Sequence, residues 1–128
     1  HPAGFRQEQY LEEIYAYERF SRGEALSAQE AGRLTPSRGQ TALVWRAVRG
    51  GGVSADPDAL ASRLGAWEDS PPISPGQVRI AADVLIEAGL IAREGEKFRI
   101  VPAEGKTDLT QTAILCDLYR RQKGCEAP

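Results

Sequence analysis

The segment from residue 74 to residue 89 most constrains the fold, because it carries both the start and the stop signals of one helix. Ser74 and Gln77 have the spacing of a capping box, and Pro75 suits the first turn of a helix. Gly89 is the residue type that most easily takes the left-handed conformation just after a helix. The sequence therefore predicts a helix that begins after Ser74 and ends before Gly89.

Inside this predicted helix, apolar residues repeat with the spacing of one buried face. Val78, Ala81, Ala82 and Leu85 lie at positions i, i+3, i+4 and i+7. The residues expected to face outward are Gln77, Arg79, Asp83 and Glu87. Ile80 and Val84 are left either partly exposed or buried by another element.

Two short strands follow the helix. Residues Leu90–Glu94 and Lys97–Val101 alternate around Gly95, as the arms of a tight hairpin do. Val53 is expected to add a further short strand to this hairpin. The pattern of helix, glycine and hairpin is that of the second half of a winged helix, which favours a small interaction domain over a catalytic one.

The rest of the chain predicts further helices. The first spans about 6–20, and its apolar and aromatic stripe consists of Tyr10, Leu11, Ile14, Tyr15 and Tyr17. The second spans about 27–34, where Ser27 and Glu30 suit a capping box, and the third spans about 40–49. Asp56 is expected to cap a fourth helix, and Thr110 a last helix in which Ile114, Leu115, Leu118 and Tyr119 pack inward. Residues 35–39 are expected to form a turn or a mobile loop.

This order of elements predicts the fold class. The chain is expected to be mainly α with a small β-hairpin, forming a winged-helix-like domain preceded by an N-terminal helical arm. Residues 1–39 would be the arm that packs on the domain, residues 40–123 the winged-helix-like domain with its C-terminal helix, and residues 124–128 a frayed tail. The absence of any Met predicts that the chain is a piece of a larger protein.

Several classes of chemistry lack the residues that they need. The only His among 128 residues is His1, so a nucleophile has no imidazole base, and two Cys without an internal His cannot form a zinc site. We therefore expect no enzyme activity, no catalytic residue, no metal site and no cofactor in this chain. Cys116 and Cys125 are expected to be free thiols in a reducing compartment. With no apolar run of membrane-spanning length, the predicted location is the cytoplasm.

The charge pattern leaves two functions open. A formal net charge of −2 differs from that of a strongly basic nucleic-acid module, and two of the four outward residues of the helix after Ser74 are acidic. The basic residues near the hairpin, beside an apolar groove, would suit an acidic peptide with a hydrophobic anchor. The predicted partner-binding residues are Arg79, Arg93, Lys97, Arg99 and Lys106. Those on the strands could equally be ordinary strand-edge charge. The alternative function is a direct DNA-binding winged helix, acting as a DNA-holding arm or a transcriptional regulator.

Three short segments resemble a known family. Residues 84–91, 98–100 and 105–109 are similar to the extreme carboxy-terminal region of certain bacterial RecJ-type single-stranded-DNA exonucleases. In that family a helix ending in Glu-Leu-Gly precedes a short hairpin and a Lys-x-Asp-Leu segment. This chain departs from the pattern where Thr112 stands in place of a Ser and where Tyr119 comes later than the family's Tyr.

The resemblance implies an accessory role in DNA repair and recombination. The family's enzymes degrade single-stranded DNA from the 5′ end with two divalent metals held by Asp-His-His and related motifs, which this chain lacks. A divalent metal is thus expected only in the absent catalytic core. By the resemblance, the domain would dock the acidic, Phe-ended tail of single-stranded-DNA-binding protein or a helicase-type motor. It would meet single-stranded DNA through its parent enzyme, and it would bind no membrane.

Overall fold

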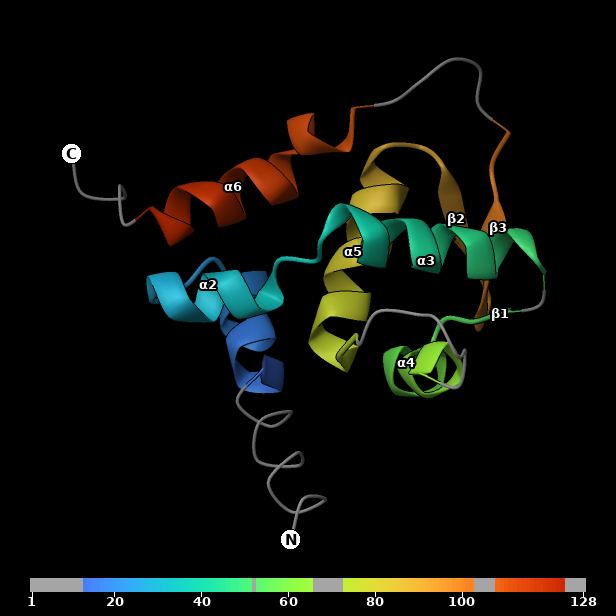
Figure 1. The fold of residues 1–128 in the computed structure, drawn as a ribbon, viewed down its shortest axis with the longest axis horizontal. Coiled ribbons are helices and arrows are strands. Elements are labelled where there is room, and N and C mark those ends of the chain that lie inside the picture. Colours follow the sequence, from blue (N-terminus) through green and yellow to red (C-terminus); the bar gives the residue numbers. More distant parts are fainter. Residues whose placement is uncertain (1–12, 52, 66–72, 103–107, 124–128) are drawn as a thin grey trace, which may run out of the picture.

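The chain folds into a mainly helical structure with one three-stranded antiparallel sheet (Figure 1). The computed structural model describes residues 13–51, 53–65, 73–102 and 108–123. Residues 13–21 are helical, and the later elements are α2 (Ala28–Leu34), α3 (Arg38–Arg49), β1 (Val53–Ser54), α4 (Pro57–Gly65), α5 (Pro75–Glu87), β2 (Ile91–Glu94), β3 (Lys97–Ile100), the 3₁₀ helix η1 (Leu109–Gln111) and α6 (Ala113–Gln122). The predicted mainly-α fold with a small β element is confirmed.

Capping boxes set the starts of three helices. The predicted boxes at Ser27 and Ser74 are both present. The predicted turn or mobile loop over residues 35–39 is too long: residues 35–37 connect α2 to α3, but a third box starts α3 at Arg38. The Ser37 hydroxyl accepts from the Gln40 backbone N–H, the Gln40 side chain accepts from the Ser37 N–H, and the helix begins at Arg38.

Single side chains cap two more helices. Asp56 accepts from the Ala59 N–H at 3.1 Å and so caps α4, as predicted. The predicted cap of the last helix at Thr110 is wrong. Thr110 lies in η1, where its N–H and its hydroxyl both donate to the Asp108 carboxylate, and Thr112 caps α6 instead.

The sheet has the strand order β1-β3-β2. Val53 pairs with Phe98, so the predicted additional strand is confirmed, and Glu94 pairs with Lys97 at the tip of the hairpin. Gly95 turns the hairpin with a φ of +63°, a conformation that favours glycine. This register places Arg93 on the same face as Phe98, and Arg99 on the opposite face with Ala92.

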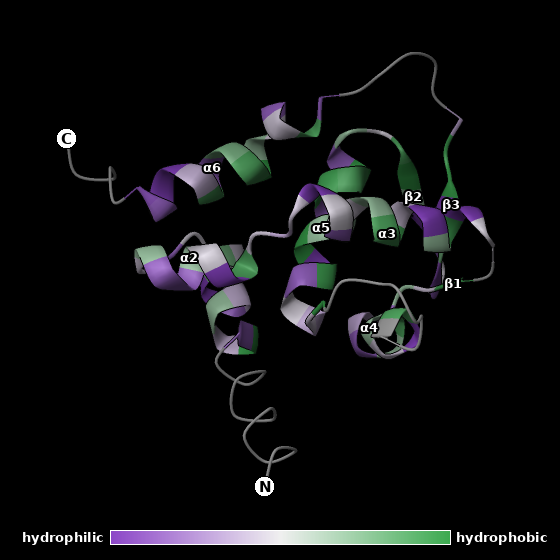
Figure 2. Cartoon of the chain, in the orientation of Figure 1, coloured by the Kyte–Doolittle hydropathy of each residue, from purple (hydrophilic) through white to green (hydrophobic). Residues whose placement is uncertain are grey.

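Two hydrophobic cores meet on α5. In Figure 1, α5 lies between α2 on one side and α4 and the strands on the other. The first core joins α3, α4, one face of α5 and the sheet, and its largest members are Leu43, Val44, Val48, Val53, Leu60, Leu64, Ile73, Val78, Leu85, Ile91 and Phe98. The second joins residues 13–34, another face of α5 and α6, through Ala16, Leu26, Ala31, Leu34, Ile80, Val84, Leu115 and Leu118. Figure 2 shows α6 changing from hydrophobic near η1 to hydrophilic at its carboxyl end.

The second core decides what α5 exposes. Ile80 and Val84 have no exposed surface, so another element buries them. The prediction that Arg79 and Asp83 face outward is wrong, because helix 13–21 covers both and leaves them half-buried. Glu87 is exposed as predicted, but its carboxylate contacts α6.

The aromatic residues depart from the predicted stripes. On helix 13–21 the buried residue is Ala16, whereas 59% of the Tyr15 surface is exposed. On α6, Leu115 and Leu118 pack inward as predicted, but 37% of the Tyr119 surface is exposed. Tyr10, Leu11 and the predicted tail at 124–128 lie outside the described residues.

Candidate functional site

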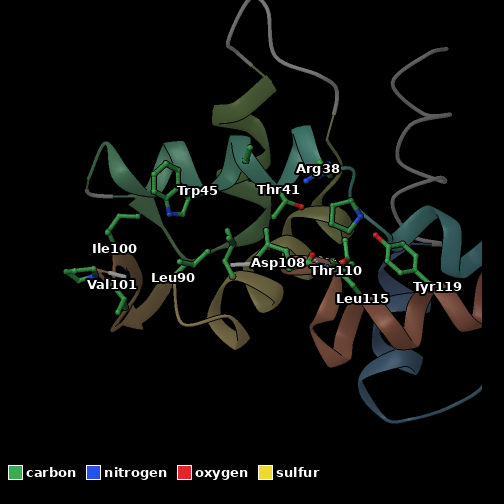
Figure 3. A pocket seen from close by; sticks show the side chains of 15 residues that line it. Arg38, Thr41, Trp45, Leu90, Ile100, Val101, Asp108, Thr110, Leu115 and Tyr119 are labelled. Carbon is green, nitrogen blue, oxygen red and sulfur yellow. Dashed lines mark hydrogen bonds between the residues drawn. The ribbon is translucent and has the colours of Figure 1, made fainter. Parts of the chain in front are cut away.

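An apolar pocket of about 650 Å³ opens between α3, the end of the hairpin and the η1–α6 segment (Figure 3). Its lining residues are Pro36, Arg38, Thr41, Ala42, Trp45, Leu85, Leu90, Ile100, Val101, Pro102, Asp108, Leu109, Thr110, Leu115 and Tyr119. Most of them are hydrophobic, and the polar groups are few. A volume of roughly 300–1,000 Å³ with this character is usual for sites that bury a small ligand or a side-chain anchor.

One face of α3 forms a wall of this pocket. Arg38, Ala42, Trp45 and Arg49 follow one another at i, i+4, i+7 and i+11, which places them along one stripe of the helix. The capping box at Ser37 fixes where this stripe begins. The Arg49 guanidinium lies over the Trp45 ring, 4.9 Å from its centre, as a cation–π pair. The apolar wall therefore carries a cation at each end.

The two ends of the apolar pocket differ in chemistry. In Figure 3, Trp45, Ile100 and Val101 lie at one end, whereas Arg38, Thr110 and Tyr119 lie toward the other. At the second end the Thr110 side chain and N–H donate to Asp108 at 2.5 and 3.0 Å. These hydrogen bonds lower the pKa of Asp108, and the nearby charge of Arg38 adds a smaller effect in the same direction. The Asp108 carboxylate is thus held ionised beside Arg38.

Hydrogen bonds from α5 position α6, which forms another wall of the apolar pocket. The Glu87 carboxylate accepts from the N–H of Ala113 at 2.5 Å and of Ile114 at 3.3 Å. Both N–H groups are in the first turn of α6, where the helix leaves them without an internal partner. A negative charge at this end also complements the helix dipole. Glu87 thereby joins the C-terminus of α5 to the wall that carries Leu115 and Tyr119.

A second, polar pocket of about 440 Å³ lies between α5, the hairpin and helix 13–21. Arg79 and Arg93 line it, together with three carboxylates, those of Asp56, Asp83 and Glu96. Carboxylates therefore outnumber arginines by three to two in the lining of this pocket.

The charged groups on α5 in the polar pocket are engaged with helix 13–21. Tyr17 Oη donates to Asp83 Oδ2 at 3.0 Å, and the Arg79 guanidinium lies 5.2 Å from the centre of the Tyr17 ring. Burial raises the pKa of Asp83, while the Tyr17 hydrogen bond and Arg79 oppose that shift. Burial, and then the Asp83 charge, raise the pKa of Tyr17.

The predicted partner-binding residues do not form one surface. Arg79 and Arg93 meet at the polar pocket, whereas Lys97 and Arg99 lie on the other face of the hairpin. Arg99 Nε is 2.8 Å from Glu94 Oε2 in an exposed ion pair. Lys106 lies outside the described residues. None of the four described cations lines the apolar pocket.

Sequence patterns missed the residues of the apolar pocket. Trp45 and Arg49 carried a usable signal, because their spacing places them on the face of α3 opposite Leu43 and Val44. The sequence pattern did not identify Arg38, because it predicts a helix that begins only at about residue 40, whereas α3 begins at Arg38. Tyr119 was assigned to the core because its position continues the apolar pattern of α6.

Neither a metal-ligand cluster nor a membrane span is found within the described ranges. No group of three or more His, Cys, Asp or Glu side chains there could hold a metal ion, and no helix there has the length and apolar character to cross a bilayer. Comparison of the chain with protein families, curated proteins and solved structures finds no match.

Proposed function

We propose that this chain is a non-catalytic, winged-helix-like domain that binds the hydrophobic anchor of an acidic peptide in its apolar pocket. The observation that carries the proposal is the α3 stripe, in which Trp45 lines the pocket and holds Arg49 against its ring. Arg46 is exposed in the same last turn of α3. An apolar pocket beside arginines suits a ligand that has a hydrophobic side chain next to carboxylates.

The order of the elements supports the winged-helix-like part of the proposal. From α3 onward the chain runs helix, strand, helix, helix and hairpin, and β1 pairs with β3 of the hairpin. In a DNA-reading domain of this kind, the helix at the position of α5 enters the major groove. Here helix 13–21 covers Arg79 and Asp83, and α6 contacts Glu87. This packing supports a protein partner over direct DNA reading.

The identity of the partner follows from the family resemblance alone. On that basis we propose a cytoplasmic accessory domain of a RecJ-like exonuclease in DNA repair. The partner would be the acidic tail of single-stranded-DNA-binding protein or a helicase-type motor. The pocket chemistry favours the first of these, because that tail is acidic and ends in a phenylalanine.

A binding assay with matched variants tests the proposal. The probe is a fluorescein-labelled ten-residue peptide with four aspartates followed by a C-terminal phenylalanine, and fluorescence anisotropy gives the Kd. Tyr119→Ala removes an exposed ring that lines the pocket, and we expect the Kd to rise about five- to tenfold. Tyr15→Ala removes an exposed ring that does not line it, and should leave the Kd within about twofold.

Two further measurements separate the competing functions. Lys97→Glu changes a cation on the hairpin face away from the pocket, so peptide affinity should stay within about twofold of the wild-type value. If Lys97→Glu weakens the peptide while Tyr119→Ala does not, the binding surface is the hairpin and the pocket assignment is wrong. Tight binding of oligonucleotides with a steep salt dependence would favour the DNA-binding alternative.

A further inference from the structure

The apolar pocket has one end that attracts an acidic chain and one end that does not. At the Trp45 end, Arg46 and Arg49 are exposed, and neither forms an ion pair with a carboxylate of the described residues. At the other end the cation Arg38 has the ionised Asp108 nearby. The net charge is thus positive at the first end and close to zero at the second.

We infer that an acidic peptide binds this pocket in one direction, with its carboxylates over Arg46 and Arg49 and its hydrophobic anchor between Leu90 and Leu115. Asp108 is the residue that sets this direction, because its carboxylate repels acidic groups from the Arg38 end. This inference rests on the proposed function and adds the orientation of the ligand to it.

The Arg49 side chain is prepared for this role by its contact with Trp45. The guanidinium lies 4.9 Å from the centre of the indole ring, a cation–π contact that restricts the side chain while Arg49 stays exposed to solvent and to a carboxylate. An arginine that is already ordered loses less side-chain entropy when it binds. The same indole forms part of the apolar lining, so anchor and carboxylate are recognised side by side.

Asp108 is fixed in position by its own hydrogen bonds. Two donors from Thr110 orient the carboxylate at the start of η1, next to Leu109 in the pocket lining. Replacing Asp108 with Asn removes the charge but keeps an oxygen that can accept from Thr110. The variant Asp108→Asn therefore tests the charge and leaves the turn intact.

Four variants test the assignment of the ends with the same Asp-rich peptide at low salt. Arg49→Gln should weaken binding about three- to fivefold. Arg49→Lys keeps the charge but not the planar guanidinium, so it should weaken binding by a smaller factor. Asp108→Asn should tighten binding about two- to fivefold, because Arg38 then becomes an unopposed cation. The double variant Arg38→Gln/Asp108→Asn should bind within about twofold of the wild type. Unchanged affinity in both Arg49→Gln and Asp108→Asn would overturn the inference.

A spin label on the peptide measures the direction itself. With a nitroxide at the acidic end, the NMR signals of the Trp45 indole and the Arg49 and Gly50 amides should broaden more than those of Leu109 and Thr110. The reverse pattern overturns the orientation but leaves the pocket as the binding site. If no signal of the pocket shifts or broadens at millimolar peptide, the proposed function fails and the orientation with it.

Discussion

Tyr17 donates a hydrogen bond of 3.0 Å to Asp83, a residue 66 positions later in the chain. The bond joins helix 13–21 to α5, and the Arg79 guanidinium lies against the same tyrosine ring. Tyr17 therefore covers the side of α5 that a DNA-reading domain would leave open. A single phenol therefore contributes both to the stability of the second core and to what the molecule can bind.

Removing this phenol oxygen should destabilise the protein. Tyr17→Phe keeps the ring over Arg79 but leaves a half-buried carboxylate without its donor, so we expect the free energy of unfolding to fall by about 1 kcal/mol. Urea unfolding followed by circular dichroism measures the change. Tyr15→Phe, at an exposed tyrosine on the same helix, is the control and should change stability by less than about 0.5 kcal/mol. Equal effects of the two variants would show that the Tyr17–Asp83 bond adds nothing.

Gly76 should resist substitution even though it lies in a helix. A Cβ at this position would be 3.2 Å from Glu13 Oε2 and 3.3 Å from Leu34 Cδ2, which is closer than side chains normally approach. We expect Gly76→Ala to cost about 1 kcal/mol, since crowding outweighs the better helix propensity of alanine.

Gly32→Ala is the matched control for this substitution. Nothing lies within 4 Å of the Cβ that it adds, and Gly32 is inside α2. This variant should raise stability by about 0.5–1 kcal/mol. The midpoints of thermal unfolding of the two variants should therefore move in opposite directions. A gain for both would mean that helix 13–21 has room to shift.

Stability should respond to pH through two carboxyls where helix 13–21 meets α5, Glu13 of the first helix and Asp83 of the second. Burial raises the pKa of Glu13 above its ordinary 4.5 and that of Asp83 above its ordinary 3.8; Ser74 and Arg33 oppose the first shift, and Tyr17 and Arg79 the second. A pKa that is raised in the folded state gives stability that is complete below the ordinary value and is lost as the pH rises through the folded value.

Glu13→Gln isolates part of this pH dependence. The variant should be more stable than the wild type near about pH 7, and the difference should shrink as the pH falls toward about 4. Urea midpoints at several pH values measure this difference. Comparing variant with wild type removes the opposite contributions of Glu30 and Asp108, whose pKa values are lowered. A difference that does not change with pH would exclude Glu13 as its source.

Loss of the Glu87 carboxylate should loosen α6 specifically. Glu87→Ala leaves the N–H groups of Ala113 and Ile114 without their acceptor, so we expect a loss of about 0.5–1 kcal/mol and faster hydrogen exchange in the first turns of α6. Glu94→Ala breaks an exposed ion pair with Arg99 and should change neither α6 exchange nor stability by more than about 0.5 kcal/mol.

Local signals predicted most of the elements, because capping and turn residues act over a few positions. The capping boxes at Ser27 and Ser74 and the turn at Gly95 are of this kind. The second face of α5 could not be obtained in this way. Ile80 and Val84 are buried by residues far away in the chain, and only packing reveals that.

The candidate site was predicted less well than the fold, for a related reason. Arg79 and Arg93 come together only when the hairpin folds back beside α5, while Lys97 and Arg99 turn away through the alternation of the strand. The apolar pocket draws residues from α3, the hairpin, η1 and α6. Its shape depends on the arrangement of elements, which charge and spacing along the chain do not encode.

The position of α5 between two cores has a practical consequence for anyone who shortens this protein. A truncated form that begins at α3 keeps every strand, yet it uncovers Ile80 and Val84, each worth roughly 1.5–3 kcal/mol when buried. Such a truncation should aggregate or recruit another hydrophobic surface. Residues 13–34 thus belong to the smallest unit that can stay folded and monomeric, because they cover this face of α5.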